Sequence, residues 1–236
     1  MSLHWNFKSV VKAGLIVSAF MIIGACNRKP VTVAILGDSY STFAGYIPEN
    51  YITWYTDEPR GTNDVCSADS TWWKRLSSET GCDILINSSF SGSTICHSGY
   101  NGEDYSDRSY VTRLKNITSL SPAPEVLFIF GGTNDHWAKS PLGQLKYSDW
   151  TDEEMYETLP AFCWILHYLQ GTMPDTEVVV IMNYDLNADL VEGMREASRH
   201  YNVTFLELPE IDLADGHPTN KGMAQICDHV KKFLIK

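Results

Sequence analysis

Residues 31–36 form the apolar, β-branched run Val-Thr-Val-Ala-Ile-Leu, which stops abruptly at Gly37-Asp38-Ser39. Such a run predicts a buried strand, and a glycine permits a sharp turn directly after it. In open α/β sheets, ligands bind at the carboxyl ends of the strands. Ser39 is therefore a candidate functional residue, although Gly-Asp-Ser taken alone is also an ordinary turn.

Three later segments strengthen this interpretation. One apolar run breaks into small residues around Gly92, a second is followed closely by Asn134, and a segment near the carboxyl terminus places His217 before a helical pattern. Serine, glycine, asparagine and histidine thus occur in this order at predicted strand-to-loop junctions. The four segments together resemble the SGNH (GDSL-type) hydrolases, a family named for these residues, from Val31 to the last predicted helix.

The resemblance implies a serine ester hydrolase, and we expect it to need neither a metal nor another cofactor. Ser39 would be the nucleophile and His217 the general base, because a serine hydroxyl attacks only when a neighbouring base takes its proton. The oxyanion hole would comprise the backbone N–H groups of Ser39 and Gly92 and the side-chain amide of Asn134. A neutral amide suits this role because it donates hydrogen bonds without a counter-charge.

The acidic partner of the histidine departs from the family pattern. The usual spacing is Asp-x-x-His, but Ala214 stands three residues before His217. Asp215 lies two residues before the histidine and Asp212 five residues before it. Either carboxylate could orient the imidazole if the loop bends suitably, and Asp215 is preferred for its proximity. A Ser-His dyad whose histidine is held by a backbone carbonyl is the third alternative.

The chain contains the letters Gly-Thr-Asn-Asp twice, at 61–64 and at 132–135. The first copy follows a polar segment that does not predict a strand, whereas the second follows five apolar residues. The asparagine of the oxyanion hole is therefore expected to be Asn134 and not Asn63.

The amino-terminal segment has the features of a secretion signal. Lys8 and Lys12 precede an apolar run at 13–23, which is too short to span a bilayer and fits the core of a signal peptide. The run leads into Ile-Gly-Ala-Cys26, which resembles a bacterial lipobox.

These features predict a lipoprotein signal peptide over residues 1–25 and a single hydrolase domain over residues 26–236. Lipidation of Cys26 would anchor the domain to a membrane of the bacterial cell envelope, on the periplasmic face or the cell surface. The alternative is an ordinary secretory signal with an incidental cysteine.

Removing residues 1–25 takes away two lysines and no acids, so the formal net charge falls from −11 to −13. An acidic chain without basic clusters is not expected to bind nucleic acid.

The remaining cysteines are odd in number and their spacing does not match a metal site. Cys66 and Cys96 lie in loop-like sequence and could pair, whereas Cys163 and Cys227 lie on apolar helical faces and are expected in the core. The fifth is Cys82.

The alternation of strand and helix patterns predicts an α/β fold. We expect a three-layer, flavodoxin-like sandwich in which helices cover both faces of a five-stranded, mostly parallel sheet. The Gly-x-Ser-x-Gly elbow of α/β-hydrolases and the glycine motifs of nucleotide-binding loops do not occur. The predicted strands lie at 31–36, 84–87, 125–130, 177–182 and 203–208, and the helices at 70–80, 107–119, 152–170, 188–201 and 219–235.

Aromatic residues are frequent in the long segments that follow Ser39, Gly92 and Asn134. Aromatic side chains mixed with polar ones could bind a sugar, so an O-acetyl esterase acting on a carbohydrate is the expected function. The same aromatics also fit a purely structural role in packing the loops. Two alternatives stay open: a non-catalytic glycan-binding lipoprotein on a hydrolase fold, and an esterase of the lipase or lysophospholipase type.

Overall fold

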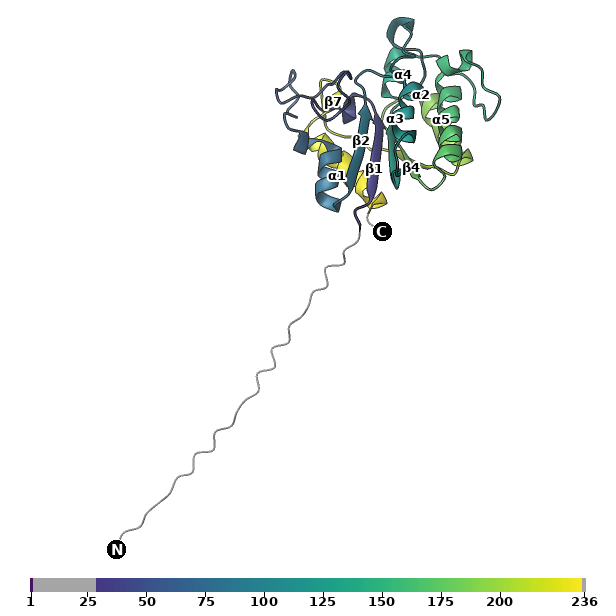
Figure 1. Ribbon diagram of the computed structural model, residues 1–236. Helices are drawn as coiled ribbons and strands as arrows, with labels where there is room; N and C mark the ends of the chain where they lie inside the picture. Colours follow the sequence, from purple (N-terminus) through teal and green to yellow (C-terminus); the bar gives the residue numbers. More distant parts are fainter. Residues whose placement is uncertain (2–28, 235–236) are drawn as a thin grey trace.

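The computed structural model describes residue 1 and residues 29–234 of the protein (Figure 1). The predicted signal peptide and Cys26 therefore lie outside the described residues. Five parallel strands form one sheet in the order β2-β1-β3-β4-β5, which confirms the predicted sheet. The strands are β1 (Thr32–Gly37), β2 (Asp83–Ser89), β3 (Val126–Phe130), β4 (Glu177–Met182) and β5 (Thr204–Glu207).

Helices cover both faces of this sheet, as the predicted three-layer sandwich requires. Because successive side chains of a strand point to opposite faces, Val33 and Ile35 of β1 belong to one buried apolar cluster, and Ala34 and Leu36 to the other. The first cluster includes residues of α1 (Trp72–Thr80) and α7 (Asn220–Val230). The second includes residues of α2 (Tyr110–Arg113), α3 (Lys115–Thr118), α5 (Thr158–Thr172) and α6 (Ala188–His200).

Short elements at the carboxyl end of the sheet depart from the expected pattern. Helix α4 (Thr133–Ala138) follows β3 directly, and β6 (Leu213–Ala214) pairs with β7 (His217–Pro218) as a small antiparallel hairpin. In Figure 1, α4 and β7 lie at the same end of the sheet, opposite the start of β1. The 3-10 helices are η1 (Ser39–Ser41), η2 (Ala68–Ser70), η3 (Tyr100–Gly102), η4 (Glu153–Tyr156) and η5 (Lys231–Phe233).

All cysteines among the described residues are free thiols. Cys163 and Cys227 are fully buried in the two apolar clusters, which confirms the predicted core role. The pairing of Cys66 with Cys96 is not formed: both are free, and the Cys96 Sγ lies 3.6 Å from the Thr158 Oγ1. Cys96 is fully buried whereas Cys66 is partly exposed, a difference that the loop-like sequence around both does not reveal.

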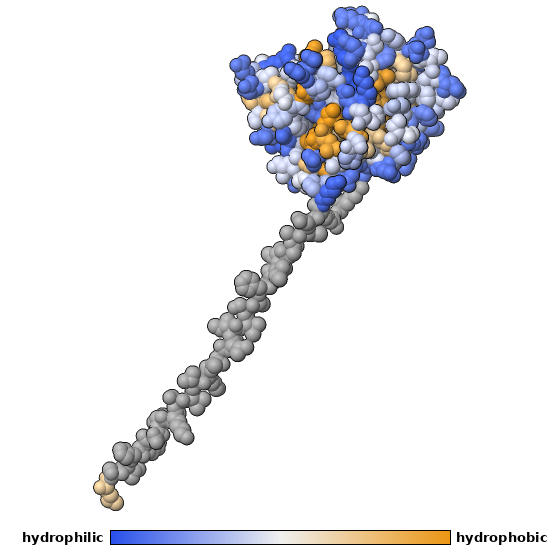
Figure 2. Space-filling view, viewed as in Figure 1, coloured by the Kyte–Doolittle hydropathy of each residue, from blue (hydrophilic) through white to orange (hydrophobic). Residues whose placement is uncertain are grey.

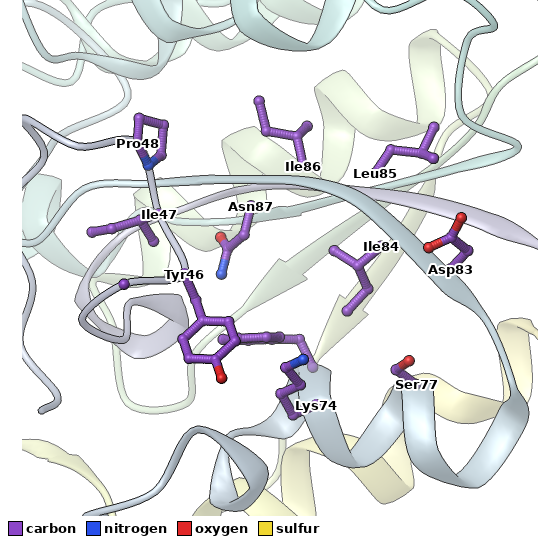
Figure 3. A pocket seen from close by; sticks show the side chains of 12 residues that line it. Tyr46, Ile47, Pro48, Lys74, Ser77, Asp83, Ile84, Leu85, Ile86 and Asn87 are labelled. Carbon is purple, nitrogen blue, oxygen red and sulfur yellow. The ribbon is translucent and has the colours of Figure 1, made fainter. Parts of the chain in front are cut away.

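Strand β2 forms one edge of the sheet and is partly open. Hydrophobic residues gather in a patch at the centre of the face shown in Figure 2. Ile84, Leu85 and Ile86 of β2 are only partly buried and line a hollow of about 470 Å³ between β2 and α1 (Figure 3).

Within residues 29–234, the structure contains no helix of the length and apolar character that crossing a bilayer requires.

Candidate active site

Ser39 occupies the turn that ends β1. The Asp38 side chain caps the short helix η1, since its Oδ1 accepts a hydrogen bond from the Tyr40 N–H at 3.0 Å. The Ser39 side chain is buried and its Oγ lies 2.9 Å from the His217 Nε2. The structure therefore brings together a hydroxyl and an imidazole that are 178 residues apart in the sequence.

His217 is held in one orientation by the hairpin that carries it. Asp215 and Gly216 form the turn between β6 and β7, with φ angles of 52° and 72°. This turn places the Asp215 carbonyl oxygen 3.0 Å from the His217 Nδ1. An N–H at Nδ1 can donate to that carbonyl, which leaves the lone pair of Nε2 to accept the Ser39 hydroxyl proton.

Neither candidate carboxylate contacts the imidazole in the described structure. The Asp215 side chain turns outward, where its Oδ2 accepts hydrogen bonds from the Thr62 N–H at 2.6 Å and the Thr62 Oγ1 at 3.0 Å. The Asp212 Oδ2 accepts one from the Thr219 Oγ1 at 2.5 Å, at the start of α7. The left-handed turn explains the difference from the expected acid, because it directs the carbonyl of Asp215 toward the ring and its carboxylate away.

Trp54 covers one face of the imidazole. Its ring is parallel to that of His217, with 3.4 Å between the centroids, and the Arg60 guanidinium lies 3.9 Å from the other face of the indole. Burial, with a smaller contribution from the charge of Arg60, lowers the pKa of His217 to about 4. The imidazole is therefore neutral at neutral pH, which is the form that can accept a proton.

Asn63, which the sequence did not single out for a role in the site, holds the histidine loop. Its Nδ2 lies 3.1–3.3 Å from the carbonyl oxygens of Ala214, His217 and Pro218, and its side chain is buried. Asn63 thus stands behind the site and not in the oxyanion hole. A polar loop without a preceding strand carries no sequence signal for this contact, which spans about 150 residues.

Gly92 and Asn134 follow the two strands that flank β1. Gly37 at the end of β1 pairs with Ser89 of β2 and with Phe130 of β3, so the loops after these three strands are neighbours. Gly92 has φ +83°, and the position of a Cβ there has no atom of a residue beyond its two chain neighbours within 4 Å, so its backbone is open to an approaching group. Asn134 lies in the first turn of α4 and is buried.

Two buried charged residues, neither found from the sequence, join these loops. Arg113 donates to the Gly37 carbonyl at 3.1 Å, to the Ser93 Oγ at 2.7 Å and to the Ser88 carbonyl. Asp135 accepts from the Ile95 N–H at 3.0 Å and from the Thr158 Oγ1 at 3.1 Å. These contacts fix the Gly92 and Asn134 loops relative to β1.

Burial also shifts the pKa of the two carboxyl groups under the site. It raises the pKa of Asp38 to about 7 and that of Asp135 to about 6. The Asp38 Oδ2 has no hydrogen-bond partner among the described atoms.

Among the described residues, the candidate site involves neither a metal-binding cluster nor the hollow beside β2. Residues 29–234 contain no group of three or more histidine, cysteine or acidic residues arranged to hold a metal ion. The hollow in Figure 3 is lined by residues such as Tyr46, Lys74 and Asn87 and does not include Ser39, Gly92, Asn134 or His217.

Comparison with known proteins identifies the family of the chain. The model of the GDSL-like lipase/acylhydrolase family matches residues 31–234. The chain belongs to this family. It is therefore a GDSL-like ester hydrolase, and its fold is shared with two solved proteins of the same description. No functionally curated protein matches the chain.

The first of these structures is a GDSL-like lipase from Bacteroides ovatus ATCC 8483, with 43% identity and a TM-score of 0.83, covering 88% of this chain and 99% of the other. The second is a GDSL-like lipase from Bacteroides uniformis ATCC 8492, with 40% identity and a TM-score of 0.81, covering 86% and 95%.

Carbohydrate esterases share the fold of this GDSL-like hydrolase at lower identity. An acetyl xylan esterase from Butyrivibrio proteoclasticus has 15% identity and a TM-score of 0.59, covering 86% of this chain and 63% of the other. A family two carbohydrate esterase from Clostridium thermocellum, in complex with cellohexaose, has 16% identity and a TM-score of 0.59, covering 88% and 65%.

Proposed function

We propose that the protein hydrolyses carboxylic esters with a Ser39–His217 dyad. The observation that carries this proposal is the 2.9 Å contact between the Ser39 Oγ and the His217 Nε2. His217 takes the hydroxyl proton as Ser39 attacks the ester carbonyl, and later returns it to the leaving alcohol. Water then attacks the acyl-enzyme with the same histidine as base, which releases the acid and restores the serine.

The charges formed in this reaction have partners in the site. The tetrahedral intermediate accepts hydrogen bonds from the backbone N–H groups of Ser39 and Gly92 and from the Asn134 amide. The imidazolium donates from Nδ1 to the Asp215 carbonyl, 3.0 Å away. It also lies against the π face of Trp54, and a cation over such a face is stabilised by about 0.5–2 kcal/mol.

We further propose that the ester is an O-acetyl group on a carbohydrate. Trp137 is 41% exposed and its ring centroid lies 6.1 Å from that of His217. It borders a cavity of about 640 Å³. The cavity lining includes the polar residues His136, Lys139, Ser140, Asn187 and Asp189. An exposed indole beside hydrogen-bonding groups suits a sugar ring better than a long acyl chain, and the acetyl xylan esterase of the same fold agrees with this choice.

The test compares p-nitrophenyl acetate, butyrate and octanoate with acetate release from O-acetylated polysaccharides. We expect at least tenfold higher kcat/KM on acetate than on octanoate, and loss of both activities in Ser39→Ala. Trp137→Ala should raise the KM for polysaccharide but not for p-nitrophenyl acetate. Tyr168→Ala serves as the matched control, because Tyr168 is similarly exposed, at 39%, but lies on α5.

Each alternative predicts a different outcome. Equal activity on acetate and octanoate would contradict a deacetylase and favour a lipase-type esterase. Binding of polysaccharide without Ser39-dependent turnover of any ester would favour the non-catalytic glycan binder.

We also propose that the protein is attached to the bacterial cell envelope by lipid at Cys26. The lipobox-like Ile-Gly-Ala-Cys26 after a signal-like apolar run supports this. We expect a fatty-acid analogue to label the parent chain and not the Cys26→Ser variant. Equal labelling of both proteins would contradict the anchor.

A further inference from the structure

The two polar atoms of the Asn134 amide have different surroundings. The Oδ1 accepts a hydrogen bond from the Tyr100 hydroxyl at 2.7 Å. The Nδ2 is buried and has no partner among the described residues. A buried amide N–H₂ without a partner is costly, so its retention points to an acceptor that is present only when substrate is bound.

Only one of the two amide orientations can serve an oxyanion. Rotation by half a turn about the terminal side-chain bond of asparagine exchanges its oxygen and nitrogen, and that torsion is intrinsically soft. One orientation offers two N–H donors to the developing negative charge, and the other offers a carbonyl oxygen that repels it. A group that donates to the Asn134 Oδ1 favours the first orientation, because only the carbonyl oxygen can accept its proton.

Tyr100 is well suited to be that donor because its loop is fixed. Around the tip of the loop, the Gly99 N–H donates to the Glu103 carbonyl at 2.8 Å, and η3 packs against α4. At its base, the Ser98 Oγ donates to the Tyr156 carbonyl at 2.7 Å, and the Ser98 carbonyl accepts from the Ser140 Oγ at 2.8 Å. The phenol is thus carried by an anchored loop, and its reach to Asn134 does not depend on a mobile segment.

The protonation of the phenol supports the same role. Burial, together with the nearby Asp38 and Asp135 carboxylates, raises the pKa of Tyr100 to about 12. The hydroxyl therefore remains a donor over the whole pH range in which an ester hydrolase is assayed.

We propose that Tyr100 is a positioning residue for the oxyanion hole: its hydroxyl fixes the Asn134 amide with the N–H₂ group directed at the developing oxyanion. This inference rests on the proposed ester hydrolysis by Ser39. Tyr100 acts through Asn134, so its effect should appear in turnover and should vanish when Asn134 is absent.

The test is a double-mutant cycle with Tyr100→Phe, Asn134→Ala and the double variant, measured as kcat and KM on p-nitrophenyl acetate. Asn134→Ala should lower kcat by about 10²–10³-fold, as for the loss of one oxyanion donor. Tyr100→Phe should lower kcat by about 5–20-fold with KM unchanged, because a neutral hydrogen bond that biases the amide contributes less than the donor itself. In the Asn134→Ala background, Tyr100→Phe should change kcat by less than about twofold.

Tyr105→Phe is the matched control. Tyr105 belongs to the same loop and its ring packs against Gly99, but its hydroxyl makes no hydrogen bond among the described residues. This variant should retain the parent kcat and KM. Circular dichroism melting of every variant shows whether the fold is kept.

A fluorophosphonate provides a readout that does not depend on the natural ester. Ser39 Oγ attacks phosphorus, the P–F bond breaks, fluoride leaves and the serine proton passes to His217. The phosphoryl oxygen occupies the position of the oxyanion, so the labelling rate should fall in Tyr100→Phe in the same proportion as kcat.

The outcomes separate the two proposals. An undiminished kcat and labelling rate in folded Tyr100→Phe would overturn the role of Tyr100 alone. An equal loss in the Asn134→Ala background, or a raised KM with kcat unchanged, would also overturn it, because Tyr100 would then act on the substrate or on the fold. A parent protein that is neither labelled at Ser39 nor active on any ester would overturn the proposed function, and this inference with it.

Discussion

Replacement of the two carboxylates near the histidine tests how His217 is oriented. In a Ser-His-Asp triad, removal of the carboxylate bonded to the histidine lowers kcat by about 10⁴-fold, because the imidazole adopts the wrong tautomer. Here the Nδ1 faces the main-chain carbonyl of Asp215 at 3.0 Å. Asp215→Asn and Asp212→Asn leave that carbonyl in place, so neither should approach a 10⁴-fold loss.

The expected magnitude follows from the contacts of each carboxylate. The Asp215 carboxylate is exposed and influences His217 only through its charge, which raises the pKa of the histidine. Exposed charge pairs of this kind are weak and screened by salt, so Asp215→Asn should lower kcat/KM by less than about fivefold. Asp212, whose carboxylate pairs with Thr219 and Lys221, should have a similarly small effect.

Asparagine is the appropriate replacement at both positions. It tolerates the left-handed backbone found at Asp215, where φ is 52°, and its amide oxygen can still accept from the Thr62 N–H. The assay is steady-state hydrolysis of p-nitrophenyl acetate by each variant, with His217→Ala as the inactive reference. A loss of 10³-fold or more in a variant that melts like the parent would refute the carbonyl-held dyad.

Three further results are expected. Burial lowers the pKa of His217 to about 4. As the pH is lowered from 7, kcat/KM should therefore stay constant through pH 6.5 and decrease only as the pH approaches about 4. A decrease centred near pH 6.5 would contradict the neutral, buried histidine. Asp38 has a raised pKa of about 7 against an ordinary 3.8, so it binds its proton more tightly when folded and the fold loses stability as pH rises through this window. As the pH rises from about 4 to 7, the melting temperature of Asp38→Asn should therefore increase relative to that of the parent. A difference in melting temperature that does not change with pH would contradict this. Asn63→Ala removes the amide that holds three carbonyls of the histidine loop, so we expect a loss of about 1–3 kcal/mol in the free energy of unfolding and a lower kcat; unchanged calorimetry and kinetics would disprove the anchoring role.

The sheet and the position of its functional edge were predictable from the sequence. Runs such as 31–36 and 177–182 are apolar on both faces, which is typical of parallel strands covered by helices, and they correspond to β1 and β4. Ser39 and Asn134 follow strands that lie side by side in the sheet.

Short helices and helix boundaries were harder to predict. Helix α4 has only six residues, too few for a helical period to be recognised, and was missed. Thr151 and Glu154 form a capping box, because the Thr151 N–H donates to the Glu154 side chain at 2.7 Å and the Glu154 N–H to the Thr151 Oγ1 at 3.4 Å. It opens η4, however, and α5 begins later, at Thr158.

The orientation of the histidine depended on contacts that are remote in sequence. The direction of the Asp215 side chain is set by a left-handed turn and by Thr62, about 150 residues away. The aromatic loop residues likewise divide by their partners: Trp54 stacks on His217, whereas the Tyr55 hydroxyl donates to the Pro218 carbonyl inside the fold. Adjacent aromatics with such different roles cannot be told apart by composition.

We propose Ser39 and His217 as the catalytic dyad of an esterase. The most direct measurement is the hydrolysis of p-nitrophenyl acetate by the parent protein and by Ser39→Ala, with melting temperature as a check on the fold. We expect turnover by the parent and at least about a 10³-fold loss in the variant, since the hydroxyl is the attacking group. Equal turnover by both folded proteins would contradict it.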